Sequence, residues 1–460
     1  MEPNDVARAV LVAAGVAGAL LALYLLSALY RAVRWITRPS ASQTAARAEE
    51  ATAAAASSSA KAAASAATAE QNRQSAHDRG KNLKTLVKDS EKASKKKEVS
   101  KDEIAAAHEL FLNTLKGHGD VVHGIAWSSD GLSLATACED MYLRIFDVSD
   151  LASREPRFKR VKTAKIPLGV GWGDGPETLT TVMKGIPDAI AAQYGPVGGA
   201  KAGEGATFEE FWQVPNAHGK ELPLTMRSVP SSASAGRIGL LFSCTTKKDV
   251  RVFNMQGREV AMLEPNSLAN HDLAVSYDGR FVAVATFTAE VKIWEMKYGK
   301  EGGCSGAAKA MELKGHKSQV NAVALSNDNK RAVTASKDGT LRVWNICVRY
   351  GMSEDAKTLV LVPLSLPPGK VYSHMAIAPG SKILAASFEG RIHLINMATG
   401  VLIESIDAHD GPITALAWCP KIRKAPVVPG SGSGAGALLA VLASSSRDKR
   451  VRLWGWKMDI

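Results

Sequence analysis

The sequence predicts an all-β fold, a propeller of seven blades, and three observations support this. A four-residue pattern (an apolar residue, a basic residue or His, an apolar residue, then an aromatic residue or Ile) occurs six times. The first two copies start 107 residues apart. Each later copy starts 41 to 59 residues after the one before it, which is the period of a propeller blade. The long first interval leaves room for one degenerate copy. The six copies are 143–146, 250–253, 291–294, 341–344, 392–395 and 451–454.

The same signals divide the chain from residue 108 to residue 460 into blades. The second blade has the weakest signal, because it rests only on GVGWGDGPETLTTVM followed by AIAAQYG. The last blade ends one strand short, so we expect residues 109–116 to supply its outermost strand and close the ring, which removes an open sheet edge. The expected blades are 118–148, 166–195, 218–256, 270–297, 316–346, 372–397 and 409–456.

Two blades are complete enough to compare with a known family. Residues 115–148 read LKGHGDVVHGIAWSSDGLSLATACEDMYLRIFDV and residues 313–346 read LKGHKSQVNAVALSNDNKRAVTASKDGTLRVWNI. Both have Gly-His, an alternating strand, a polar turn, a strand of small residues, an Asp-containing turn and a strand with an aromatic end. This order resembles the WD-repeat family, although the Trp-Asp dipeptide appears only as Phe146-Asp147, Trp344-Asn345 and Trp294-Glu295.

The resemblance implies a buried hydrogen-bond relay of His, Ser or Thr, Asp and Trp within a blade. An unpaired member would cost about 1 to 3 kcal/mol. Phe146 has no indole N–H, so the first relay lacks one donor. Thr288 and Glu389 stand where two other blades should have Asp, and we expect those blades to rely on apolar packing. The relays map to His118, Thr136, Asp140 and Phe146; to His316, Thr334, Asp338 and Trp344; and to His409, Ser444, Asp448 and Trp454.

Residues 1–38 are expected to form a membrane anchor, with a transmembrane helix at about 9–30. This run of 22 uncharged residues would cover the roughly 30 Å hydrocarbon core as a helix. A cleaved signal peptide fits less well, because Glu2 and Asp5 lie in the preceding segment and the run exceeds the usual length of about 7 to 15 residues. Arginines follow the span, which places the C-terminal bulk in the cytosol. Five cysteines without metal-like spacing and the lack of an Asn-x-Ser/Thr sequon fit that compartment.

Residues 39–107 are expected to form a linker, first rich in Ala and then in Lys. The segment has no apolar stripe to bury. Residues 31–101, which begin with the arginines after the span, carry a net charge of +8 (15 Lys and Arg against 7 Asp and Glu) out of the +12 of the whole chain. Two interpretations stay open: contact with anionic lipid headgroups, at about 1 kcal/mol for each lysine near the surface, or a solvated spacer kept extended by repulsion. The lysines concerned are Lys81, Lys84, Lys88, Lys92, Lys95, Lys96, Lys97 and Lys101.

The sequence contains no set of residues that would support catalysis. Residues 169–175 alternate glycine with larger residues but lack the GK[ST] ending of a phosphate loop, and we interpret them as a turn. No nucleophile, base and orienting group occur together, and no residues are spaced as metal ligands. We therefore predict a protein that is not an enzyme and has no catalytic, cofactor or metal site. The lysine-rich segment has no interleaved aromatic residues, which argues against nucleic-acid binding.

The order of segments along the chain indicates a particular kind of WD-repeat protein. Residues 271–300 and 308–350, together with an N-terminal span and a basic stalk, are similar to a WD-repeat protein of the endoplasmic-reticulum membrane. This resemblance implies a single-pass protein with a cytosolic propeller that docks partner proteins. The implied partner is the resident stress-signalling kinase that phosphorylates translation initiation factor 2. The alternative is a guanine-nucleotide exchange factor for a vesicle-coat small GTPase. By repeat geometry, Glu139, Lys337 and Arg447 should lie on one rim and face partners.

Overall fold

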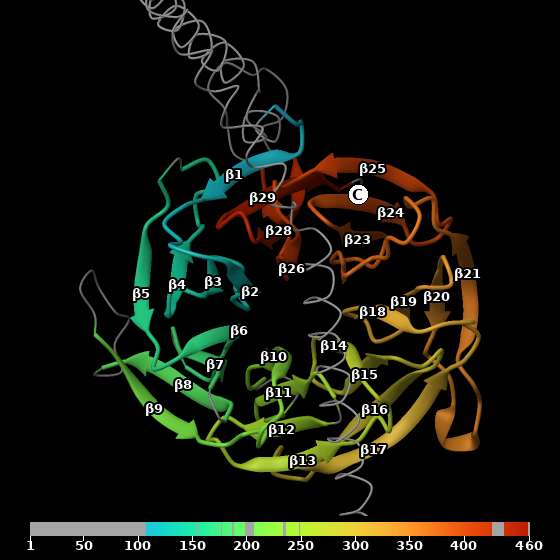
Figure 1. Cartoon of the computed structure of the whole chain (residues 1–460), viewed down its shortest axis with the longest axis horizontal. Coiled ribbons are helices and arrows are strands. Elements are labelled where there is room, and N and C mark those ends of the chain that lie inside the picture. Colours follow the sequence, from blue (N-terminus) through green and yellow to red (C-terminus); the bar gives the residue numbers. More distant parts are fainter. Residues whose placement is uncertain are drawn as a thin grey trace, which may run out of the picture. The chain divides into compact units, whose positions relative to one another are not determined.

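Seven antiparallel sheets form a ring around a central channel (Figure 1). This computed structural model describes residues 107–458 except 154, 176, 186–187, 198–206, 233–235, 248 and 426–436. The predicted all-β fold of seven blades is confirmed, including the second blade. The predicted transmembrane helix at 9–30 and nearly all of the linker at 39–107 lie outside the described residues. Within the part of the chain that is described, no helix is both long and apolar enough to cross a membrane.

The first six blades each have four strands in simple order, from an inner strand at the channel to an outer strand. Blade 1 is β2 (Val122–Trp127), β3 (Ser133–Cys138), β4 (Tyr142–Asp147) and β5 (Phe158–Lys162). Blade 2 is β6 (Ile166–Trp172), β7 (Leu179–Lys184), β8 (Ile190–Pro196) and β9 (Phe208–Val214). Blade 3 is β10 (Pro223–Val229), β11 (Leu240–Thr245), β12 (Val250–Asn254) and β13 (Glu259–Leu263).

Blade 4 is β14 (Asn270–Val275), β15 (Phe281–Thr286), β16 (Val291–Tyr298) and β17 (Cys304–Leu313). Blade 5 is β18 (Val320–Leu325), β19 (Arg331–Ser336), β20 (Thr340–Asn345) and β21 (Lys357–Pro363), and the 3₁₀ turn η1 (Tyr350–Met352) precedes β21. Blade 6 is β22 (His374–Ile377), β23 (Ile383–Phe388), β24 (Arg391–Asn396) and β25 (Leu402–Asp407).

Blade 7 joins the two ends of the described chain. Its order is β26 (Ile413–Trp418), β28 (Leu438–Ser446), β29 (Val451–Lys457) and then β1 (Phe111–Leu115), and the short β27 (Arg423–Lys424) also pairs with β28. Strand β1 lies within the range 109–116 that the sequence assigns to this place. It pairs antiparallel with β29, from Phe111 opposite Trp454 to Leu115 opposite Val451. The outer strand of the last blade therefore comes from the beginning of the propeller segment.

The blades are held together by apolar cores that lie between sheets. The described residues contain seven buried hydrophobic clusters, and each combines side chains of two neighbouring blades. The cluster at the seam between blades 7 and 1 includes Leu115, Phe146 and Leu453. The second strands of the blades are buried on both faces, as β15 and β23 show along their whole length. Such strands carry continuous runs of small and apolar residues, because both faces pack against neighbours.

Glycine lets the inner strands of blades 1, 2 and 3 approach closely. A Cβ atom on Gly124 would lie 2.9 Å from the backbone of Gly169, and one on Gly171 would lie 1.9 Å from the Ser228 hydroxyl oxygen. The expectation that residues 169–175 form a turn is therefore wrong for its first part, since β6 continues to Trp172. The glycines there serve close packing between strands rather than a reversal of the chain.

Three tryptophans at the ends of inner strands bond across blade boundaries. The indole N–H of Trp418 donates to the carbonyl oxygen of Ala376, that of Trp127 to Ala417 and that of Trp172 to Ala126, each at 3.0 Å. The donors belong to blades 7, 1 and 2, and each acceptor belongs to the preceding blade. These bonds satisfy buried indole groups and fix the spacing of adjacent inner strands on both sides of the seam.

Replacing Leu115 with Ala should weaken the ring closure. Its side chain is fully buried in the seam cluster, so the lost apolar contacts and the resulting cavity should lower the free energy of unfolding by about 2 to 5 kcal/mol. Chemical denaturation followed by tryptophan fluorescence measures the change. Replacing the neighbouring exposed Lys116 with Ala is the matched control, and it should change the value by less than about 0.5 kcal/mol. Equal effects of the two substitutions would contradict the structural role of β1.

Candidate functional site

The relay of blade 5 is complete and holds the turn between β19 and β20. The Trp344 indole N–H donates to the Thr334 hydroxyl oxygen at 2.8 Å, and the same oxygen lies 2.8 Å from Nε2 of His316. The other ring nitrogen, Nδ1, lies 3.0 Å from the Asp338 carboxylate. A carboxylate can only accept, so Nδ1 carries the proton and Nε2 accepts from Thr334. The result is a continuous chain of hydrogen bonds from the strand end to the turn.

Electrostatics keep this relay in one protonation state. Burial lowers the pKa of His316, so the ring is neutral near pH 7. Burial opposes the charge of Asp338, but hydrogen bonds from the Thr340 hydroxyl, the Lys317 backbone and His316 outweigh it and hold the pKa of the carboxyl at about 2. The ionised Asp338 thus ties the chain before β18 to the turn before β20.

Blade 7 repeats this arrangement and adds a buried arginine. His409 lies 2.8 Å from both Ser444 and Asp448, and the Trp454 indole donates to Ser444 at 3.0 Å. Arg452, whose side chain is fully buried, donates to the backbone oxygen of Ala408 and lies 3.4 Å from Asp448. The sequence pattern has Lys or Arg at this position in five of its six copies and His393 in the sixth, but the contact of Arg452 with the turn Asp appears only in the structure.

The blade 1 relay is interrupted at two points. Nε2 of His118 lies 2.9 Å from the Thr136 hydroxyl, and Phe146 packs against the His118 ring without an N–H to donate. Nδ1 of His118 has no hydrogen-bond partner, because Asp140 instead binds Arg144 in a bidentate pair at 2.5 and 3.0 Å. The mapped four-residue chain is therefore correct for His118 and Thr136 and fails between His118 and Asp140.

Two further blades contain buried polar pairs that the sequence analysis missed. In blade 3, Nε2 of His218 lies 2.6 Å from the Ser243 hydroxyl and Nδ1 lies 3.8 Å from Asp249. The sequence does contain a variant of the Gly-His motif at this place, Ala-His-Gly-Lys at 217–220, in which the Gly follows the His instead of preceding it. In blade 6, the Tyr372 hydroxyl lies 2.7 Å from Nδ1 of His393. Apolar packing alone was thus the wrong expectation for blade 6.

In blade 4 and blade 6 the residues that replace Asp have local roles. The Thr288 hydroxyl lies 2.8 Å from that of Thr286 and donates to the backbone oxygen of Glu290. Glu389 lies on the surface and pairs with Lys370 at 2.5 Å. Trp294 packs in the cluster between blades 3 and 4, as expected for a blade without the relay.

Glu139, Lys337 and Arg447 occupy equivalent positions on one rim of the ring. Each follows the second strand of its blade and donates its backbone N–H to the residue just before the inner strand, at 2.8 Å to Val121, 3.0 Å to Gln319 and 3.1 Å to Pro412. Phe287 of blade 4 makes the same bond to Ala269 at 2.9 Å, and its side chain is half exposed. We call this surface the relay rim. The sequence analysis missed Phe287, although it aligns with Lys337 when ATFTAEVKIW (285–294) is placed over ASKDGTLRVW (335–344).

Phe287 and Lys337 belong to one continuous part of the relay rim. Thr288, next to Phe287, accepts the backbone N–H of Val320, and Gln319, next to Val320, accepts that of Lys337. Leu268 precedes the acceptor of the Phe287 bond and is 83% exposed. Lys317 and Lys337 are exposed, and neither side chain takes part in an ion pair among the described residues. We call Leu268, Phe287, Lys317 and Lys337 the blade 4–5 patch.

Seven closed blades with these relays define the class of the protein: it is a β-propeller that carries WD repeats. The family model named WD domain, G-beta repeat matches residues 110–147, 308–345 and 400–455, which include the blades whose relays the sequence predicted. No group of metal-binding side chains occurs among the residues that the structure describes.

Within this class, the chain is similar to Transducin beta-like protein 2. It is 29% identical to the human protein over 321 residues and 28% identical to the mouse protein over 327 residues, and each match covers 67% of both chains. A more distant match is U3 small nucleolar RNA-associated protein 12 of Saccharomyces cerevisiae, 24% identical over 186 residues, which covers 39% of this chain and 16% of that protein.

Replacing His316 or Asp338 with Ala should lower the free energy of unfolding by about 1 to 3 kcal/mol, because each change leaves buried partners unpaired. Thermal and chemical unfolding measure this. Replacing the adjacent exposed Lys337 with Ala is the control and should have little effect. Unchanged unfolding curves for the relay variants would refute the energetic role of the relay.

Acid should destabilise the propeller between pH 6.5 and pH 4. Burial, and then the Arg144 charge, lower the pKa of His118 to about 4, so only the unfolded chain binds this proton in that window. For one histidine, the free energy of unfolding falls by at most about 1.4 kcal/mol for each pH unit. Asp272, whose pKa burial raises to about 6, acts in the opposite direction, but His316, His393 and His409 act with His118. Melting temperatures from pH 7 to pH 4.5 should fall, and less steeply for His118→Gln.

Proposed function

We propose that this protein is a scaffold that docks partner proteins on its relay rim. The observation that carries the proposal is the blade 4–5 patch, in which exposed apolar side chains lie beside unpaired lysines on turns that the sheets hold rigid. Exposed apolar residues grouped on a fixed surface are typical of interaction sites.

The chemistry of the blade 4–5 patch indicates the kind of partner. Phe287 and Leu268 offer an apolar contact, and large side chains of this kind contribute most of the binding energy at the centre of an interface. Lys317 and Lys337 lie at the edge, where charge steers association and selects the partner. A segment with an apolar side chain flanked by acidic residues fits this arrangement.

The proposed setting is the endoplasmic-reticulum membrane. Residues 9–30 would anchor the chain, the arginines that follow would keep the propeller in the cytosol, and residues 39–107 would link the two. The uncharged run at 9–30 and the arginines that follow it are the sequence features behind the proposed membrane anchor and orientation. The proposed partner is a stress-signalling kinase of the same membrane. The guanine-nucleotide exchange alternative stays a hypothesis that no feature described above favours.

Replacing Phe287 with Ala, or Lys337 with Glu, should reduce binding of the partner's cytosolic region at least tenfold. The first change removes the apolar contact and the second reverses the charge beside it. Surface plasmon resonance with purified proteins measures affinity. The matched control is Phe211→Ala, because Phe211 on the outer strand of blade 2 has a similar exposed fraction, 55% against 52% for Phe287. Loss of binding in the control alone would place the interface elsewhere.

Protease treatment of sealed microsomes tests the proposed topology. An antibody to the propeller should detect its complete digestion without detergent, because the proposed orientation exposes the propeller on the outside. A lumenal protein in the same vesicles should stay intact as the control. Protection of the propeller would reverse the proposed topology.

A further inference from the structure

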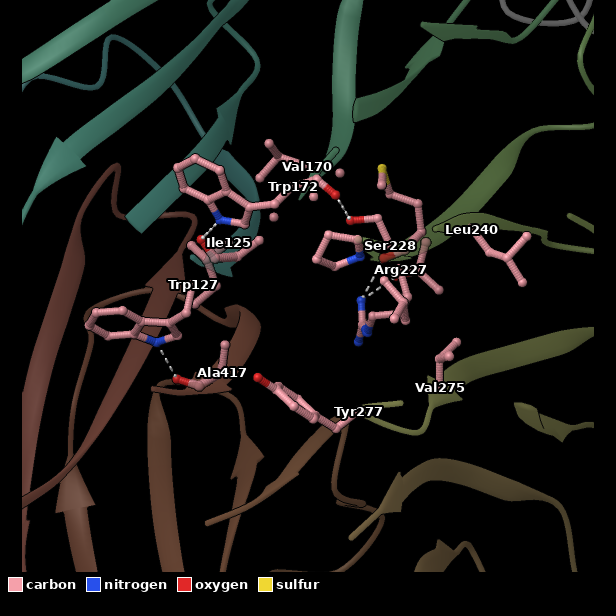
Figure 2. Close-up of a pocket in the computed structure, with 18 of the residues that line it drawn as sticks. Ile125, Trp127, Val170, Trp172, Arg227, Ser228, Leu240, Val275, Tyr277 and Ala417 are labelled. Atoms are coloured by element: carbon pink, nitrogen blue, oxygen red, sulfur yellow. Dashed lines mark hydrogen bonds between the residues drawn. The ribbon is translucent and has the colours of Figure 1, made fainter. Parts of the chain in front are cut away.

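The channel contains a cavity of about 1020 Å³ between the inner strands. Its size is that of a site for a small organic molecule. Trp127, Trp172 and Tyr277 line it, and Arg227 reaches it from β10. Figure 2 shows the Arg227 guanidinium and the Tyr277 hydroxyl pointing into the open space, with the two tryptophans across from Arg227.

Arg227 stands where every other inner strand has Ala or Gly. Each of these seven residues pairs with the corresponding residue of the second strand in its own blade, as Arg227 does with Phe242 and Ala324 with Val333. The structural register therefore makes them equivalent. The ring thus has a single large, charged side chain at this level of the channel. The other six residues are Ala126, Gly171, Ala274, Ala324, Ala376 and Ala417.

The charge of Arg227 is not neutralised by an ion pair within the described residues. One nitrogen, Nη1, donates to the Thr225 hydroxyl at 3.0 Å and to the backbone oxygen of Met226 at 2.9 Å. No carboxylate of the described residues lies within ion-pair distance. The remaining guanidinium donors are those that Figure 2 shows toward the cavity.

The acidic side chains that line the cavity are already occupied. Asp278 pairs with Arg237 at 3.0 Å, and Asp174 accepts bonds from the backbone and hydroxyl of Ser231. Asp272 accepts the backbone N–H groups of Leu273 and Val323, and burial raises its pKa to about 6. On the far side of the channel, burial and then the Arg227 charge lower the pKa of His374 to about 4, so this ring adds no positive charge near pH 7.

We propose that the central cavity binds a small organic anion, whose carboxylate or phosphate group is held by Arg227 and whose apolar part lies against Trp127 and Trp172. A guanidinium presents paired N–H groups that match both kinds of oxyanion. The tryptophan rings are fixed by their bonds to neighbouring blades and form a rigid apolar wall. Tyr277 adds a hydroxyl that can bond a second oxygen of the ligand.

Isothermal titration calorimetry of the full chain tests this with three probes: phenylacetate, phenyl phosphate and the neutral phenylacetamide. At least one anionic probe should bind with one-to-one stoichiometry, and phenylacetamide should bind at least tenfold more weakly. Which of the two anions binds more tightly distinguishes carboxylate from phosphate recognition. Failure of both anions to bind, or equal binding of phenylacetamide, overturns the proposal.

The variant Arg227→Ala should lose at least tenfold in affinity for the anionic probes. Alanine occupies the equivalent position in five other blades, so the strand accommodates it, and the melting temperature without ligand should not fall. Arg227→Lys retains the charge but not the planar donors, and it should bind more weakly than the unchanged protein.

Arg391→Ala is the matched control, because Arg391 lies on blade 6 in an exposed pair with Asp407. Its affinity for the probes should equal that of the unchanged protein. Undiminished binding by Arg227→Ala, or an equal loss in Arg391→Ala, overturns the assignment to Arg227.

Discussion

Closure of the ring is the constraint on which the rest of this structure depends. Each blade buries its faces against two neighbours, so a blade at an open end would expose an apolar face and an unpaired edge. The chain avoids this by placing β1 at the outer edge of blade 7, where it pairs with β29. Strands separated by more than 330 residues thereby form one sheet, and the seam gains a core of its own. Arg423 reinforces it with bonds to the backbone oxygens of Val148 and Ser149 in blade 1.

The relays perform a second task, which is to hold the turns on one rim. In blades 5 and 7 a neutral histidine links a hydroxyl on the second strand to the ionised Asp in the following turn. Buried polar groups in such a chain satisfy one another and would be costly to expose singly. The buried relay side chains thus hold the turns in place, while Lys337 and Arg447 beside them project into solvent. A rigid support with variable exposed side chains suits a docking surface.

The channel combines the same geometry with a different chemistry. Most inner strands have small residues at the level of Arg227, and this lets neighbouring strands approach and leaves space at the centre. A single arginine in that space meets aromatic walls supplied by blades 1 and 2. None of the four residues of the blade 4–5 patch lines the cavity, so binding at one site does not require the groups of the other.

The repeat pattern by itself determined the all-β fold and the seven blades, because strand ends recur at a fixed period. The resemblance to WD repeats located the complete relays of blades 5 and 7. Only the tertiary structure decided that Asp140 bonds Arg144 instead of His118, that Tyr372 replaces a missing relay, and that Phe287 stands beside Lys337. It also decided that Arg227 faces a cavity and that three tryptophans bond across blades. Asp140 and Arg144 are only four residues apart, but a local pattern carries no information about which of several polar neighbours lies nearest in space. The other features depend on contacts between separate strands.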